Sequence, residues 1–406
     1  MSSEWPQVRL GNHVDACLGK MLDAKKNKGM PQPYLGNSNV RWGKFELVDL
    51  AEMRFEPHEE ERYSLRPGDL VVCEGGEPGR CAIRNGGTGM KIQKALHRIR
   101  PKASFDNHYL YYWFCHAAHI GLLEPYFTGT TIKHLTGKAV AALEVAQPPI
   151  RTQQVMVDVL RALDDRITLL RETNATLEAI AQALFKSWFV DFDPVRAKLE
   201  GRTPEGMDEA TAVLFPDGFE ESELGLVPRG WRVGQLCDEL KIAYGKNLPT
   251  NKLLGSGYPV YGGNGQIGFF DKYLYESRQV LVACRGAASG KFNQSVPRAF
   301  VTNNSLILES SHGTLLPFGY LKGCIARADL IPFVTGSAQP QVTIDNLKNF
   351  KLLVPSARPL QAFESYSSSI EDQIENNNQQ AQTLATLRDT LLPRLISGQL
   401  RLPETL

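Results

Sequence analysis

Apolar residues recur at alternating steps of four and three along residues 151–190, a stretch without glycine or proline. This spacing places them on one face of a long α-helix, as a heptad seam. The seam comprises Met156, Leu160, Leu163, Ile167, Leu170, Leu177, Ala181, Leu184 and Trp188, interrupted by Asn174. At about 1.5 Å rise per residue, such a helix is roughly 55–60 Å long. It requires a partner of similar length to cover its seam.

A second stretch, residues 357–396, supplies that partner. Its apolar residues fall on the matching seam positions 207 residues later: Phe363, Ile370, Ile374, Ala381, Leu384, Leu391 and Leu395. Asn174, and Asn377 on the second helix, are expected to fix the register of the pair, because a polar residue in an apolar seam penalises other alignments. We predict that the two helices pack antiparallel.

The remainder of the chain is an internal repeat. Residues 1–40 resemble residues 227–266 at an offset of 226, Cys73 matches Cys284 at 211, and the offset is 207 from Thr128 onward. A globular unit followed by a long helix therefore occurs twice. Residues 68–76 and 277–286 predict strands that end in glycine turns, and residues 106–124 and 316–328 predict helices.

These patterns predict an α+β fold with two tandem mixed α/β, β-rich domains, separated by two long antiparallel coiled-coil helices and related by a pseudo-two-fold axis. The expected segments are a first domain over 1–150, a central helix over 151–190, an acidic proline-containing linker over 191–230, a second domain over 231–355, and a distal helix with a tail over 356–406.

The net charge of +1 hides an uneven distribution. Residues 231–355 hold 13 Lys and Arg against 7 Asp and Glu, whereas residues 191–230 hold 4 against 10. Basic globular segments favour a polyanionic partner. No apolar run is long enough to predict a membrane helix, and the polar N-terminus argues against a secretory signal. Seven cysteines without a C-x-x-C pair are typical of a reduced, cytoplasmic protein.

Motifs for catalysis are not found. Residues 286–291 (GAASGK) are one residue too short for a phosphate-binding loop and are followed by Phe292, and no Gly-x-Ser-x-Gly elbow occurs. Cys115, His116 and His119 invite a zinc interpretation, but the second ligand pair is absent, and burial of their helix against a sheet is the favoured alternative. The sequence predicts two recognition domains without a catalytic or metal site.

Four segments resemble one family. They are residues 128–149 (TGTTIKHLTGKAVAALEVAQPP), 184–202 (LFKSWFVDFDPVRAKLEGR), 214–231 (LFPDGFEESELGLVPRGW) and 390–402 (TLLPRLISGQLRL). Together with the duplicated layout, they are similar to specificity subunits of Type I restriction-modification enzymes. The second copy departs at residues 336–343 (GSAQPQVT), where the first has GTTIKHLT.

The resemblance implies a non-catalytic, cytoplasmic subunit with two target recognition domains. Each domain would read one half of a split double-stranded DNA target, and the paired helices would set the gap between the halves. The implied partners are two methyltransferase (modification) subunits and restriction (motor-nuclease) subunits, with no membrane. S-adenosylmethionine, ATP and Mg²⁺ would belong to those partner chains, and this chain would bind no cofactor.

Base and phosphate contacts require Asn, Gln, Arg or Lys on loops. The first-domain candidates are Lys20, Lys25, Lys26, Asn37, Asn39, Arg41, Lys44, Arg80, Lys91 and Lys94. The second-domain candidates are Lys246, Asn247, Asn264, Gln266, Arg285, Lys291 and Asn293. For each of them, a solvated surface role is the alternative. The pairs Lys20/Lys246 and Arg80/Lys291 are favoured because they match across the repeat.

Four aromatic residues near the end of the first long helix exceed what one seam can bury: Phe185, Trp188, Phe189 and Phe192. We predict that they bind a methyltransferase helix; the alternative is that they pack on the adjacent globular domain. Two other functions are also compatible with the sequence. One is a stand-alone sequence-specific DNA-binding protein, an orphan specificity subunit, and the other is a coiled-coil scaffold that does not bind DNA.

Overall fold

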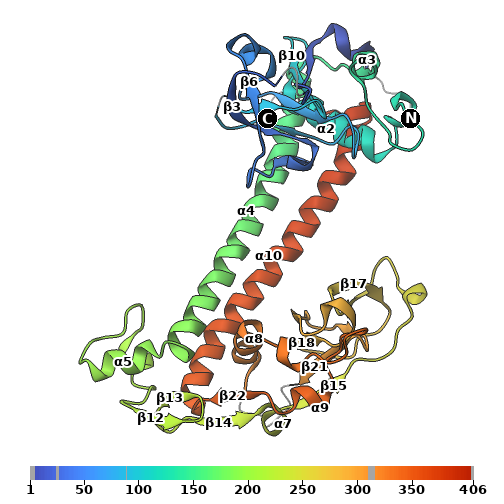
Figure 1. Cartoon of the computed structure of the whole chain (residues 1–406). Helices are drawn as coiled ribbons and strands as arrows, with labels where there is room; N and C mark the ends of the chain where they lie inside the picture. Colours follow the sequence, from blue (N-terminus) through green and yellow to red (C-terminus); the bar gives the residue numbers. More distant parts are fainter. Residues whose placement is uncertain (1–4, 24–26, 88, 310–315, 404–406) are drawn as a thin grey trace. The chain divides into compact units, whose positions relative to one another are not determined.

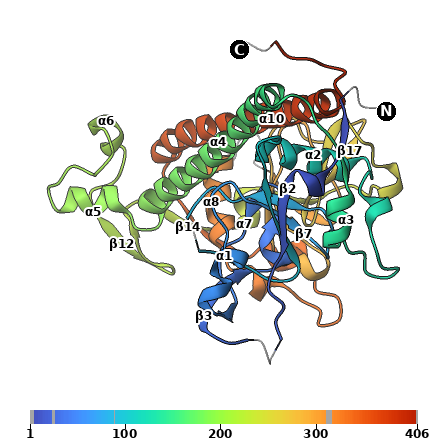
Figure 2. The same ribbon diagram turned by 90° about the horizontal axis from the view of Figure 1, so that it is seen from above.

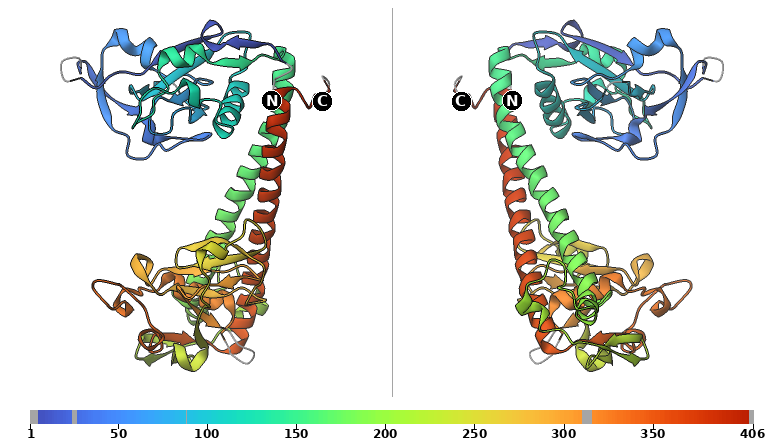
Figure 3. Two further views of the ribbon diagram at one scale, coloured as in Figure 1. Left: turned by 90° about the vertical axis from the view of Figure 1, so that its right-hand side faces the viewer. Right: turned by 90° about the vertical axis from the view of Figure 1, so that its left-hand side faces the viewer.

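The structure is a computed structural model that describes residues 5–23, 27–87, 89–309 and 316–403. The chain divides into two compact units, residues 1–169 with 380–406 (unit 1) and residues 170–379 (unit 2). Helices α4 (Ile150–Phe189) and α10 (Ala357–Ser397) are each continuous, as Figures 1 and 3 show. Each unit contains part of both helices, and the ends of both lie within one residue of the predicted ones.

Unit 1 is built on a four-stranded antiparallel sheet in the order β2-β10-β7-β8. Its strands are β2 (Val14–Leu18), β10 (Leu96–Pro101), β7 (Leu70–Cys73) and β8 (Cys81–Ile83). A second sheet, in the order β6-β3-β9, contains β6 (Glu52–Phe55), β3 (Met30–Leu35) and β9 (Lys91–Ile92). Short pairs join β1 (Gln7–Arg9) to β11 (Glu144–Ala146) and β4 (Val40–Arg41) to β5 (Lys44–Phe45).

The helices of unit 1 include α2 (Asn107–His119), which lies within the predicted segment 106–124 and ends before its last residues. The predicted cap, Asp106, accepts hydrogen bonds from the backbone N–H groups of His108 and Tyr109. The other helices are α1 (Glu60–Tyr63), α3 (Gly137–Ala142) and the 3₁₀ turns η1 (Leu10–Asn12), η2 (Asn37–Asn39), η3 (Pro57–Glu59) and η4 (Glu124–Tyr126).

Unit 2 repeats the main sheet in the order β15-β21-β18-β19, with all neighbours antiparallel (Figure 1). Its strands are β15 (Lys241–Tyr244), β21 (Ser305–Glu309), β18 (Val280–Ala283) and β19 (Phe292–Gln294). The second sheet has the order β17-β16-β20 and contains β17 (Gly265–Phe270), β16 (Tyr258–Gly262) and β20 (Phe300–Val301). Two further strand pairs complete the unit. They join β12 (Phe219–Ser222) to β13 (Gly225–Pro228) and β14 (Arg232–Gln235) to β22 (Lys351–Val354).

The predicted helix near residues 316–328 is α8 (Phe318–Arg327). The remaining helices of unit 2 are α5 (Asp193–Leu199), α6 (Glu209–Ala212), α7 (Leu236–Glu239), α9 (Ile344–Leu347) and the 3₁₀ turns η5 (Thr250–Lys252), η6 (Gly286–Ala288) and η7 (Ile331–Phe333).

The two units therefore share one strand order, and single contacts repeat as well. In unit 1 the Tyr109 hydroxyl donates to the carbonyl oxygen of Ala146 at 2.9 Å. In unit 2 the Tyr320 hydroxyl donates to the carbonyl oxygen of Leu353 at 2.6 Å. These bonds make α2 and α8 equivalent elements, each tied to the strand that leads into a long helix.

In both units α4 and α10 pack against each other in antiparallel directions. In unit 2 the Asn377 side-chain amide donates to Asn174 Oδ1 at 2.8 Å, and Asn174 donates to Asn378 Oδ1 at 2.9 Å and to the Ile374 carbonyl oxygen at 3.2 Å. In unit 1, Met156 and Leu160 of α4 share one core with residues near the end of α10, including Leu395. The predicted seam thus continues into the domain cores.

Residues 191–230, predicted as a linker, are folded. They form α5, α6, β12 and β13 beyond the C-terminal end of α4 (Figure 2). Val195, Phe215 and Val227 from this segment are buried in the core of unit 2. Among the described residues, no helix is both long enough and apolar enough to cross a membrane.

Candidate nucleic-acid interface

Loops gather at one end of the main sheet in each unit, and we call this surface the loop edge. In unit 1 it comprises residues 19–20, 36–39, 74–80 and 93–95, and in unit 2 residues 245–247, 262–266, 284–291 and 302–304. Backbone hydrogen bonds tie these loops together. Lys94 N donates to Lys20 O at 2.9 Å in unit 1, and Asn303 N donates to Lys246 O at 3.2 Å in unit 2.

A glycine before each matched lysine lets two backbones approach closely. A Cβ atom on Gly19 would lie 2.4 Å from the Gln93 carbonyl oxygen, and one on Gly245 would lie 2.2 Å from that of Thr302. Only glycine fits such an approach. Lys20 and Lys246 consequently form equivalent parallel bridges with the neighbouring turns, so the repeat predicted their backbone positions correctly.

The second-unit candidates are mostly accessible. Asn293, which is half-buried, donates from its side-chain amide to the Gly263 carbonyl oxygen at 2.8 Å and so holds the hairpin between β16 and β17. The exposed candidates are Lys246, Asn247, Asn264, Gln266, Arg285 and Lys291. They bring cations and amide groups together on one loop edge, which is the combination that phosphate and base-edge contacts need.

Two first-unit lysines are not available to a ligand, which corrects their prediction as DNA contacts. Lys20, 3% exposed, pairs with Glu59 at 2.5 Å and lies over the Phe55 ring. Lys91 is fully buried and pairs with Glu60, whose pKa is lowered chiefly by that hydrogen bond. Burial alone would raise the pKa of Glu59, but hydrogen bonds from Lys20 and the Glu56 backbone lower it. Buried ammonium groups need such partners.

The other first-unit candidates divide into tethered and exposed side chains. Arg80 donates to Glu77 at 2.9 Å and to the Asn37 carbonyl oxygen at 2.8 Å, while Arg41 makes two hydrogen bonds to the Glu46 carboxylate. Asn39 Oδ1 accepts from the backbone N–H of Gly36, which holds a turn. The half-buried Asn37 lies beside Arg80, and the exposed candidates are Lys44 and Lys94. Lys25 and Lys26 lie outside the described residues.

The four aromatic residues predicted to bind a partner helix are instead part of unit 2. Phe185, Trp188 and Phe189 are each about 95% buried or more. Phe189 and Tyr320 pack edge to face, with ring centroids 4.8 Å apart, and Phe192 lies against the rings of Phe219 and Trp231. The alternative prediction, packing on the adjacent globular domain, is therefore what the structure shows.

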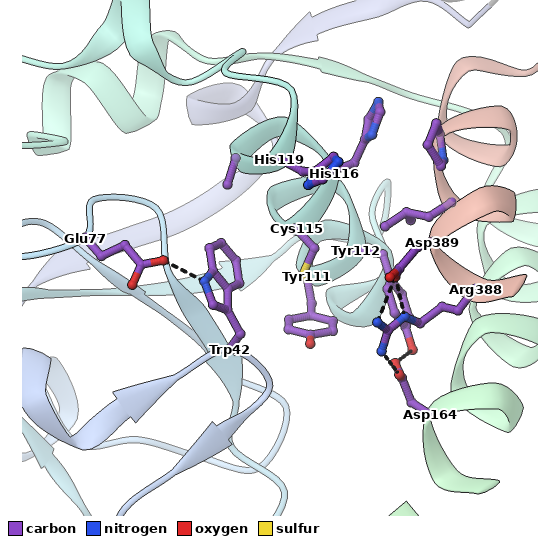
Figure 4. Close-up of a pocket in the computed structure, with 13 residues that line it drawn as sticks. Trp42, Glu77, Tyr111, Tyr112, Cys115, His116, His119, Asp164, Arg388 and Asp389 are labelled. Carbon is purple, nitrogen blue, oxygen red and sulfur yellow. Dashed lines mark hydrogen bonds and ion pairs between the residues drawn. The ribbon is translucent and has the colours of Figure 1, made fainter. Parts of the chain in front are cut away.

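A cavity of about 440 Å³ lies in unit 1 between α2, the helix pair and the turn that carries Glu77 (Figure 4). Trp42 donates from its indole N–H to Glu77 at 2.7 Å, and the Tyr112 hydroxyl donates to Asp164 at 2.7 Å. Cys115, His116 and His119 line this cavity, but within the described residues they do not join a group of three converging metal ligands. Burial, and then the neighbouring His119, lower the pKa of His116.

One exposed residue of the loop edge, Asn304, was not among the predicted DNA-binding candidates. Asn304 is exposed in the turn between β20 and β21, and its carbonyl oxygen accepts from Cys284 N at 2.9 Å. Two consecutive asparagines directly before a β-rich run were the available signal for a polar turn.

Comparison with known proteins agrees with this architecture. Residues 3–179 and 228–384 match the family model "Type I restriction modification DNA specificity domain". The chain is 26% identical over 345 residues to the MjaIX specificity subunit of Methanocaldococcus jannaschii, covering 78% of this chain and 74% of that one. It is 28% identical over 335 residues to the HindI specificity subunit of Haemophilus influenzae, covering 66% of this chain and 72% of that one.

A solved structure shares the fold. The S subunit of a Type I restriction-modification system from M. genitalium aligns with a TM-score of 0.60 at 17% identity, covering 97% of this chain and 96% of that chain. The family match covers most of the sequence and falls on both copies of the internal repeat. The chain therefore belongs to the specificity subunits of Type I restriction-modification systems, and it carries their DNA specificity domain twice.

Proposed function

We propose that this chain, a non-catalytic specificity subunit, binds a split double-stranded DNA target through its two loop edges. The observation that carries the proposal is the loop edge present in both units, which exposes cationic and amide side chains in unit 2 and the cation Lys94 in unit 1. Cations on such a surface neutralise phosphates, while Asn, Gln and Arg side chains discriminate base edges. Two different sets of side chains would read two different half-sequences.

We further propose that two methyltransferase subunits and the restriction subunits assemble on this chain in the cytoplasm. S-adenosylmethionine, ATP and Mg²⁺ would then act in those partners. The helix pair offers a support for such an assembly, because Asn174 and Asn377 bond across it in unit 2 and each unit packs part of the pair into its core. The aromatic residues at the end of α4 are not proposed as the methyltransferase contact, since unit 2 buries them.

Mapping methylated adenines in a genome that expresses this chain with its methyltransferase tests the proposal. We expect one split sequence to be methylated, and methylation to disappear when this chain is omitted. Methylation that does not depend on this chain, or a target without a gap, contradicts the proposal. Expression of the chain without the methyltransferase, followed by duplex-binding measurements, separates a stand-alone DNA-binding role.

Lys246→Ala sharpens the test at one residue. Because Lys246 is exposed on the loop edge, its loss should weaken duplex binding and reduce the slope of log affinity against log salt by about 1. Lys102→Ala is the matched control, since Lys102 is also exposed but follows the last residue of β10, at the opposite end of the sheet from the loop edge. An unchanged slope in Lys246→Ala removes this residue from the interface.

A further inference from the structure

Each unit contains a seven-residue loop that closes on itself, residues 128–134 in unit 1 and 335–341 in unit 2. Thr128 and His134 exchange two backbone hydrogen bonds of 2.9 and 2.8 Å, and Thr335 and Gln341 exchange two of 2.8 Å. The second residue of each loop is a glycine with positive φ, 93° at Gly129 and 87° at Gly336. The backbone shape is thus repeated, although the tips differ in sequence.

The closed loops are attached to the loop edges. In unit 1, Leu135 N donates to the Glu74 carbonyl oxygen at 2.7 Å, and His134 lies against Gly75, where an added Cβ would be 3.2 Å from the His134 Nδ1 atom. In unit 2, Gly286 N donates to the Pro340 carbonyl oxygen at 2.9 Å. Arg285 forms an antiparallel bridge with Gln341, so these two exposed side chains come from neighbouring backbones.

The side chains that the two loops expose differ in kind. The first loop presents Lys133 and His134 together with Ile132, whose side chain is 64% exposed. The second presents the amides Gln339 and Gln341, and residues 335–343 contain no Lys, Arg, Asp or Glu. A lysine ammonium pairs with phosphate whatever the base sequence. A glutamine amide can donate to and accept from one adenine edge, and an arginine can donate two hydrogen bonds to the acceptors of one guanine edge.

We propose that loop 335–341 reads base edges together with Arg285, whereas loop 128–134 holds the phosphate backbone through Lys133. This inference rests on the proposed function, because it assumes that both loop edges meet duplex DNA. It adds that the two domains use the same loop for different tasks, so the second loop contributes to sequence choice and the first to affinity.

The test uses the full chain with its methyltransferase and two labelled duplexes, one carrying the mapped target and one with the same bases scrambled. Dissociation constants are measured by fluorescence anisotropy between about 50 and 200 mM salt. Gln339→Ala and Gln341→Ala should each weaken target binding about tenfold and leave scrambled-duplex binding unchanged. Lys133→Ala should weaken binding to both duplexes equally and lower the salt slope by about 1.

Matched controls are Gln361→Ala, at an exposed glutamine of α10, and Lys102→Ala, beyond the far end of β10. Hydrogen-exchange profiles of each variant show whether the fold is retained. Glutamine variants with an unchanged ratio of target to scrambled affinity overturn the reading role, and an unchanged salt slope in Lys133→Ala overturns the clamping role. A wild-type chain that does not prefer its mapped target would instead contradict the proposed function, which separates the two failures.

Methylation mapping gives a second readout. Base reading by loop 335–341 predicts that Gln339→Ala or Gln341→Ala relaxes one half of the methylated sequence and leaves the other half and the gap unchanged. Lys133→Ala should reduce methylation without changing the sequence. Relaxation in both halves, or in neither, contradicts the assignment of the second loop to one half-site.

Discussion

Helices α2 and α8 occupy equivalent places in their units, but they attach to the helix pair differently. In unit 2 the globular domain supplies the cation of this contact, and the helix pair supplies the carboxylates. Lys322 of α8, which is 8% exposed, pairs with Glu371 of α10 and, at 2.7 Å, with Glu178 of α4. Two glycines of α8 let it approach side chains of the helix pair closely: a Cβ on Gly319 would lie 2.1 Å from Ser367 Oγ, and one on Gly323 would lie 2.2 Å from the Phe185 ring. Arg278 adds ion pairs to Asp372 and Glu375.

In unit 1 both charges of the corresponding contact belong to the helix pair. Arg388 of α10 pairs with Asp164 of α4 at 2.5 Å, and Asp164 corresponds to Glu371 at the 207-residue offset. The domain contributes the neutral hydroxyl of Tyr112, which takes the place of Gly323. The cavity of about 440 Å³ lies beside this contact, whereas the one at the unit 2 contact is about 280 Å³.

The difference teaches that the repeat conserves the position of the contact and not its chemistry. Removing Lys322 would leave two carboxylates without the cation that now pairs with both, and one of them, Glu371, is only 4% exposed. Removing Tyr112 would leave Asp164 still paired with Arg388. We therefore expect unit 2 to be more sensitive than unit 1 to substitution of its domain helix.

Lys322→Met gives the largest expected effect. It keeps the apolar stem but leaves the buried Glu371 carboxylate uncompensated, which should destabilise unit 2 by about 3–5 kcal/mol. Hydrogen exchange followed by mass spectrometry, with peptides from each unit, measures the loss. Arg388→Met is the matched change in unit 1 and should cost less, because Asp164 is 29% exposed and keeps its bond from Tyr112. Equal losses would show that the two contacts do not differ as described.

Gly323→Val should have the next largest effect. The added methyl groups must displace the Phe185 ring, which is held among Tyr320, Phe189 and Phe363, so we expect a loss of about 3 kcal/mol in unit 2. Gly255→Ala is the control, because no atom lies within 4 Å of a Cβ at that position. A stable Gly323→Val variant would mean that the close approach of α8 is not required.

The long helices and the repeat were predictable because their signals are local or periodic. A heptad pattern, broken in the first helix by Asn174, predicted α4 and α10 to within one residue at each end. Asn174 and Asn377 were predicted as register residues, and they bond to each other across the pair. The folded state of residues 191–230 was not predicted, because its buried positions are separated by acidic and proline-containing stretches that hide any period.

It was harder to predict which side chains of the loop edge are exposed and free to contact DNA. Lys20 and Lys246 have equivalent backbones, but Lys20 turns inward to Glu59, a residue 39 positions later that the repeat does not reveal. The sequence suggested that α4 has more aromatic residues near its end than the helix seam can bury. The residues that bury them, including Tyr320 and Phe363, are distant in sequence and could not be identified from it. Such contacts depend on tertiary packing, which composition and spacing do not encode.

Tyr112→Phe should produce a smaller change, confined to unit 1. It removes one hydrogen bond to Asp164 and leaves the packing of the ring, so we expect a loss of about 1 kcal/mol. Peptides covering α2 should exchange faster, while those covering α8 should not change. A loss comparable to that of Lys322→Met would contradict the view that the first contact depends little on the domain helix.

Mild acid should cause the smallest difference in stability between the two units. The reason is that the buried His97 of unit 1 corresponds to the buried Leu306 of unit 2, which cannot bind a proton. Burial lowers the pKa of His97 below its ordinary value of 6.5. The unfolded chain therefore binds a proton at a pH where the folded domain does not, and stability falls as pH drops below about 6.5. Between pH 7 and pH 6 the loss attributable to His97 should be below about 1 kcal/mol.

Hydrogen exchange measured across this pH range, with rates corrected for intrinsic exchange, should show unit 1 opening more readily while unit 2 stays nearly constant. His108 and His116, whose pKa values burial also lowers, lie in unit 1 and act in the same direction. In unit 2, burial raises the pKa of Glu364. The folded unit therefore binds this proton more readily than the unfolded chain, so Glu364 does not destabilise unit 2 as the pH falls. His97→Leu should flatten the response of unit 1 in part, and an equal response of both units in the wild-type chain would place the acid-sensitive groups elsewhere.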